Sequence, residues 1–207
     1  MKKWLLASFA VLIMASCEKE HGLDNDYLVY TNYDNSFNFK DYSTFYIPDK
    51  IMAISYEIEP DYIEGDMADR IVRMYVDNME AMGYTRVENK EDADLGIQLT
   101  YINDTHHFVS YFDSPYWWWG YSGYWSPSFW GNWGYWYYPY PVSYSYSEGS
   151  LLTDMVNLKA EQGDEEKLPV VWNSYISGLS TGSKYMDTSL LVRGVNQSFL
   201  QSGYLKK

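Results

Sequence analysis

PDYIEGDMADRIVRMYVDNMEAMG, residues 60–83, is the stretch that decides the fold. Apolar residues recur in it at spacings of three and four, which predicts a helix with a single buried stripe. We expect Asp61 to be its N-cap, Glu64 to complete a capping box, and Gly83 to end it. At this spacing the methionines indicate core packing and not a soft-metal site. The stripe comprises Ile63, Met67, Ile71, Met74, Tyr75, Met79 and Met82.

The next patterned stretch, ADLGIQLTYI at residues 93–102, alternates between apolar and small or polar residues. Leu95, Ile97, Leu99 and Tyr101 fall on one face, and Gly96, Gln98 and Thr100 fall on the other. This alternation predicts a strand that is half-buried, with one face toward a core.

Further strands are predicted where β-branched and aromatic residues gather. A charged turn joins the last two of them as a hairpin. Asp187 is then expected to cap a second helix with Leu191, Val195 and Phe199 on one face. The predicted strands lie in YLVYTNYD (27–34), DYSTFYI (41–47), GSLLTDMVNL (149–158) and LPVVWNSYISGL (168–179).

Two helices with single apolar stripes and several strands with single apolar faces can bury one another. The sequence therefore predicts an α+β fold, a two-layer sandwich of a mostly antiparallel sheet with both helices on one face. A long aromatic insert containing glycine and proline interrupts it at about residues 111–147. Met67, Ile71, Met74 and Leu99 are expected to share a core with Trp172.

The N-terminus has the form of an export signal. Positive charge at Lys2 and Lys3 precedes an apolar run that is too short to span a bilayer as a helix. Small residues then precede Cys17, the only cysteine, in an arrangement that resembles the lipobox of bacterial lipoproteins. The resemblance implies a signal peptide at 1–16, a lipidated tether at 17–26 and one domain at 27–207.

Lipid on Cys17 would hold the protein at a membrane, and we expect that membrane to be the outer membrane. Glu18 and Glu20 fit a cell-surface sorting signal as well as an ordinary soluble N-terminus, so the face of the membrane stays open. The formal net charge of −13 excludes nucleic acid as a partner, because duplex binding depends on basic residues that neutralise phosphates.

Five short motifs occur in the order seen in a lipoprotein family called domain of unknown function 4136. They are DYSTF, MGYTRV, ADLGIQL, GSLLTDMVNL and PVVWNSYISGL, and the resemblance extends over about residues 27–202. It implies an envelope lipoprotein with no established activity. Two positions depart from the family: Thr153 stands where an aliphatic residue is usual, and Asn157 where an acid is common.

The sequence offers no pattern of known catalytic or metal chemistry. His106 and His107 are adjacent at a strand end, where successive side chains point to opposite faces, so they are not expected to ligate one metal. SGLSTGSK, residues 177–184, lacks the order of a phosphate-binding loop. We therefore expect no metal, no cofactor and no enzymatic activity.

The aromatic insert is the candidate contact surface. Its glycines and prolines prevent all its rings from packing into one small core, so some of them should be exposed. Four roles stay open: association with an envelope protein or with a second copy, contact with a glycan, contact with the membrane surface, and cover for the open face of the sheet. The candidate residues are Tyr116, Trp117, Trp118, Trp119, Tyr124, Trp125, Trp130, Trp133, Trp136, Tyr137 and Tyr138.

The sequence thus favours a non-enzymatic, lipid-anchored binding or assembly module. The alternative is a hydrolase or transferase acting on envelope glycans, with the aromatic residues as sugar subsites. Asp113, Glu148 and Asp154 would then supply the acid and the base.

Overall fold

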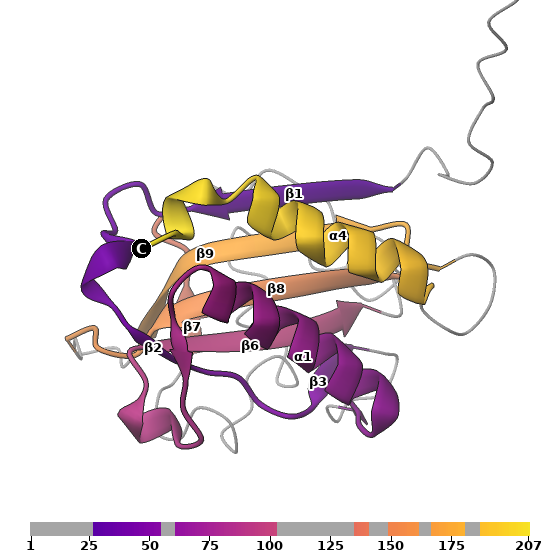
Figure 1. Cartoon of the computed structure of the whole chain (residues 1–207), viewed down its shortest axis with the longest axis horizontal. Helices are drawn as coiled ribbons and strands as arrows, with labels where there is room; N and C mark the ends of the chain where they lie inside the picture. Colours follow the sequence, from indigo (N-terminus) through magenta and orange to yellow (C-terminus); the bar gives the residue numbers. More distant parts are fainter. Residues whose placement is uncertain (1–26, 55–60, 103–134, 141–148, 162–166, 181–186) are drawn as a thin grey trace, which may run out of the picture.

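The computed structural model describes residues 27–54, 61–102, 135–140, 149–161, 167–180 and 187–207 (Figure 1). Within these ranges, two α-helices lie on one face of a sheet. The helices are α1 (Asp66–Ala81) and α4 (Thr188–Leu200). The strands are β1 (Leu28–Tyr33), β2 (Thr44–Tyr46), β3 (Ile51–Ile54), β4 (Asp61–Ile63), β5 (Thr85–Arg86), β6 (Leu95–Ile102), β7 (Tyr135–Tyr137), β8 (Ser150–Asn157) and β9 (Lys167–Ser177).

The long strands form an antiparallel centre in the order β1, β9, β8, β6. Short strands extend it: β2 and β3 pair in parallel with successive parts of β6, β5 pairs with β2, and β4 pairs antiparallel with β3. The predicted α+β class, with a mostly antiparallel sheet and both helices on one face, is confirmed (Figure 1).

The start of α1 differs from the prediction. Asp61 lies in β4 and not at an N-cap, because Asp61–Ile63 pairs with β3. The Glu64 carboxylate accepts a hydrogen bond from Lys50 at 3.2 Å instead of closing a capping box. Gly65, with a φ of 77°, turns the chain into the helix, which begins at Asp66. The other end is as predicted, since Gly83 follows the last turn with a φ of 100°.

The helix-side core lies between the helices and the sheet. Ile71, Leu99 and Trp172 are buried in it, and Met67 and Met74 pack against its margin. The predicted sharing of one core by these five residues is confirmed.

Strand β6 is buried on both faces, so the prediction of a half-buried strand is wrong. Gln98 and Thr100, which were assigned to the open face, are 1% and 0% exposed. A second apolar cluster lies on that face, away from the helices, and includes Leu152, Val156 and Tyr175. The second face of the sheet is therefore buried as well.

Helix α4 is capped as predicted. The Asp187 carboxylate accepts hydrogen bonds from the backbone N–H groups of Ser189 (2.8 Å) and Leu190 (3.2 Å). The predicted stripe of Leu191, Val195 and Phe199 is buried. Among the helices in the described ranges, neither α1 nor α4 is long and apolar enough to cross a membrane.

Candidate contact surface

The end of the aromatic insert is attached to the edge of the sheet. Strand β7 pairs in parallel with β9 from Tyr135 opposite Lys167 to Tyr137 opposite Pro169. This is the first part of β9, ahead of the part that pairs with β1. The segment that follows β7 then reaches polar groups on the second face of the sheet.

These polar groups form a row across four adjacent strands. Gln98 of β6 lies opposite Asp154 of β8, which lies opposite Asn173 of β9, which in turn lies opposite Asn32 of β1. Gln98, Asp154 and Asn173 are at most 1% exposed. Burial of polar groups is costly unless they are hydrogen-bonded, so this polar row requires partners.

Two tyrosines after β7 supply partners for the polar row. The Tyr138 hydroxyl donates to Oδ1 of Asp154 at 2.7 Å, and the Tyr140 hydroxyl donates to Oδ1 of Asn173 at 3.0 Å. The two rings meet edge to face with centroids 5.9 Å apart. The segment 135–140 is therefore held by backbone pairing at one end and by side-chain hydrogen bonds to the buried row at the other.

The loop that carries the insert, residues 103–148, starts and ends at the same place on the sheet. Gly149 N donates to Ile102 O at 2.9 Å, directly beyond the last β6–β8 pair. Gly149 has a φ of 72°, and a Cβ added there would lie 2.6 Å from Cβ of Ser180. Only glycine fits this closure, because both the backbone conformation and the space exclude a larger residue. The attachment at β7 lies near the opposite end of β8, about 20 Å away at 3.3 Å per residue.

Three of the predicted contact residues lie within the described part of the insert. Tyr137 and Tyr138 are half-buried, and the backbone of Trp136 in β7 pairs with that of Leu168 in β9. The remaining predicted sites lie outside the described residues. They are Cys17, Tyr116, Trp117, Trp118, Trp119, Tyr124, Trp125, Trp130 and Trp133.

Sequence reasoning missed Tyr140 and the polar row. A signal was present, because Gln98, Asp154 and Asn173 are polar residues inside otherwise apolar strands. Their alignment depends on the register of three strands, which no local pattern contains.

One of the three carboxylates considered for glycan chemistry can be placed. Asp154 is 0% exposed and accepts the Tyr138 hydroxyl, so the structure gives it a partner and no access to solvent. Asp113 and Glu148 lie outside the described residues. Within the ranges that the structure describes, no group of three or more His, Cys, Asp or Glu side chains could hold a metal ion.

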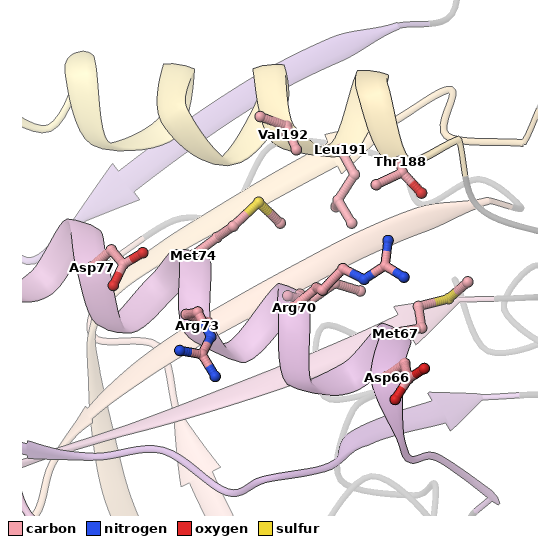
Figure 2. Close-up of a pocket in the computed structure, with 10 residues that line it drawn as sticks. Asp66, Met67, Arg70, Arg73, Met74, Asp77, Thr188, Leu191 and Val192 are labelled. Atoms are coloured by element: carbon pink, nitrogen blue, oxygen red, sulfur yellow. The ribbon is translucent and has the colours of Figure 1, made fainter.

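A separate hollow lies on the helical face. It has a volume of about 460 Å³ and runs between α1 and the first turns of α4 (Figure 2). Asn78 of α1 donates to Asn196 of α4 at 3.3 Å just beyond its far end, where the two helices are joined. We call this hollow the interhelical groove.

Residues 29–202 match the model of the family described as Domain of unknown function (DUF4136). The chain belongs to this family. It is similar to the crystal structure of a DUF4136 family protein from Bacteroides thetaiotaomicron VPI-5482, with 58% identity and a TM-score of 0.79. That match covers 88% of this chain and 99% of the other. No curated protein matches.

The two positions that were expected to depart from the family pattern, Thr153 and Asn157, have structural roles here. Thr153 is fully buried, and its hydroxyl shares a 2.5 Å hydrogen bond with the Tyr75 hydroxyl on α1. Burial raises the pKa of Tyr75, so this hydroxyl stays protonated. Asn157 ends β8, where its amide donates to the Tyr42 hydroxyl and its Oδ1 accepts from Lys159 N at 2.9 Å. Both side chains are hydrogen-bonded parts of this DUF4136 domain.

Proposed function

We propose that this DUF4136 protein is a lipid-anchored, non-enzymatic protein of the outer membrane that binds another envelope protein or a second copy through its aromatic insert. Cys17 would carry the lipid, because it follows a positively charged start, an apolar run and two small residues. The domain would then be presented at the membrane by the tether of residues 17–26.

The observation that carries the proposal is the docking of Tyr138 on Asp154 and of Tyr140 on Asn173. The domain contributes a buried polar row to hold the last part of the insert. The aromatic sequence from 111 to 134 therefore stands between two attachments to the sheet, at Ile102 and at β7. An uncharged sequence rich in Trp and Tyr has the composition of a protein-binding surface.

The environment of Asp154 also favours binding over catalysis. A general acid or base must reach the proton that it transfers. Asp154 is buried beneath the insert, and its Oδ1 accepts the Tyr138 hydroxyl. Its described contacts are those of a residue that anchors the insert.

The test uses the purified lipoprotein immobilised in mild detergent. Four separate arms present it with envelope extract, peptidoglycan, envelope polysaccharide or liposomes. A chemical cross-linker is added in the extract arm. The test variant has Trp117, Trp118 and Trp119 changed to Ala. The matched control is Leu200→Ala, which removes an apolar side chain that is 76% exposed on α4.

We expect the wild type and Leu200→Ala to become cross-linked to a defined envelope protein or to a second copy of this chain. The triple variant should form no such product. If only a glycan or only liposomes are captured, and this capture requires the three tryptophans, then that ligand and not a protein is the partner. Product formed from polysaccharide and lost in Asp154→Asn would overturn the non-enzymatic proposal.

A further inference from the structure

We propose that the interhelical groove binds a long-chain fatty acid, with its alkyl chain along the groove and its carboxylate at Arg70. This site lies on the helical face, whereas the insert segment 135–140 contacts the opposite face of the sheet. The inference is therefore independent of the function proposed for the insert.

The groove has an apolar floor and apolar walls. Ile71 and Leu191 form the floor, at 1% and 2% exposed, and Val192 contributes a wall that is 38% exposed. The half-buried side chains of Met67 and Met74 complete the lining. Thioether side chains are flexible and polarisable, so they adapt to a chain whose conformation varies.

Arg70 is the cation placed to receive the head group. Figure 2 shows its side chain reaching from α1 toward Thr188 and Leu191 of α4, over the groove. Arg70 makes no hydrogen bond or ion pair within the described part of the chain. A guanidinium matches a carboxylate with two parallel hydrogen bonds, and the exposed Thr188 hydroxyl lies close enough to the groove to add a donor.

The other charges of the lining fix the position of the head group. Asp66 and Asp77 stand toward the two ends of the stretch of α1 that lines the groove, where each would repel a carboxylate. Arg73 also borders the groove, but Figure 2 shows its guanidinium directed away from α4. An anionic head is thus favoured at Arg70, between the two aspartates.

The size of the groove suits a small amphipathic ligand. The lining part of α1, from Asp66 to Asp77, is about 16 Å long at 1.5 Å per residue. The groove offers about 460 Å³, which falls within the range of small-molecule sites, so a single alkyl chain can enter it.

The test measures displacement of a fluorescent fatty acid by palmitate, below the micellar concentration. It uses the whole chain with Cys17→Ser, so that no covalently attached acyl chain competes. Hexadecanol, which has the same alkyl chain without the charge, is measured alongside. Arg70→Gln is compared with its matched control Arg73→Gln, and Val192→Asp places a charge inside the groove.

We expect palmitate to bind and Arg70→Gln to weaken it about three- to tenfold, while hexadecanol is unaffected and Arg73→Gln changes neither. Val192→Asp should abolish binding of both ligands in a protein whose thermal melt shows that it is folded. The proposal is overturned if palmitate does not displace the probe. It is also overturned if the two arginine variants behave alike, or if Val192→Asp binds as the wild type does.

Discussion

The Tyr138 hydroxyl and the Asp154 carboxylate, 16 residues apart in the sequence, are joined at 2.7 Å and connect the insert to the middle of the sheet. Tyr138→Phe removes this donor from a buried carboxylate. We expect it to lower the free energy of unfolding by about 1–3 kcal/mol. Urea denaturation followed by circular dichroism measures the change.

Tyr137→Phe is the control for this variant. The hydroxyl of Tyr137 makes no hydrogen bond within the described residues, so its loss should be nearly neutral. Limited proteolysis adds a local readout, because cleavage between residues 103 and 148 should become faster in Tyr138→Phe. Equal stability of the two variants would show that the Tyr138 contact does not hold the insert.

Ile71 tests the helix-side core. This side chain is 1% exposed, and Ile71→Asp would bury a charge without a partner. We expect a loss of about 3–5 kcal/mol in the free energy of unfolding. Arg73→Asp places the same charge on the exposed side of the same helix and should change stability by less than about 1 kcal/mol. A small effect of Ile71→Asp in chemical denaturation would contradict the assigned packing of α1.

Gly194 allows α4 to approach strand β9 closely. A Cβ added to Gly194 would lie 2.6 Å from Cγ2 of Ile176, so Gly194→Ala must displace the helix or the strand. We expect a net loss of about 1–3 kcal/mol even though alanine is the better helix former. Gly203→Ala is the control, because a Cβ there meets nothing within 4 Å. Thermal melts measure the change, and equal melting temperatures for the two variants would refute the expectation.

Burial of the Tyr84 hydroxyl predicts a loss of stability at alkaline pH. Burial raises the pKa of its hydroxyl to about 12, and this hydroxyl faces the carbonyl oxygens of Phe39 (3.2 Å) and Leu205 (3.0 Å). A pKa that is higher in the folded state than in the unfolded state means that folding favours the protonated form. The stabilisation is therefore complete below about pH 10, the unfolded value, and is lost as the pH rises toward 12.

The measurement compares the free energy of unfolding of the wild type and of Tyr84→Phe from pH 8 to 12. The variant should be less stable at pH 8, since two buried carbonyl groups lose a donor. The difference should shrink as the pH rises, because phenylalanine does not titrate. A difference that stays constant up to pH 12 would rule out the assigned role of Tyr84.

Cys17→Ser tests the membrane attachment. Removal of the thiol removes the site of lipid attachment, so we expect an unprocessed precursor without incorporated fatty acid. Metabolic labelling with an alkynyl fatty acid and gel mobility give the readout, and His21→Ser serves as a nearby control. A Cys17→Ser protein that is labelled and processed normally would disprove the lipid anchor.

The elements that were predicted correctly are those with a strong local pattern. The α1 stripe, the Asp187 cap and the long strands β6, β8 and β9 each carry their signal within about ten residues. The start of α1 was misjudged because Asp61 and Glu64 have the spacing of a capping box, whereas pairing of β4 with β3 determines the backbone there. Long-range pairing overrode a local preference of modest energy.

The burial of the second face of the sheet could not be predicted from the sequence for the same physical reason. Alternation along β6 marks Gln98 and Thr100 as polar, and exposure is the ordinary inference. Their burial depends on residues distant in the chain, and the register that aligns Gln98 with Asp154 and Asn173 is set between strands. The composition singles out the insert as a candidate contact surface, but the hydrogen bonds of Tyr138 and Tyr140 cannot be inferred from composition.

The closure between Ile102 and Gly149 has a consequence for how such a protein can diversify. Because one backbone hydrogen bond seals the base of the insert, its length and sequence can change without altering the register of β6 against β8. Within the described residues, the tyrosines that hold the insert are Tyr138 and Tyr140, so their contacts constrain the segment 135–140. A different insert can thus be carried on the same sheet, as long as Gly149 at its exit is kept.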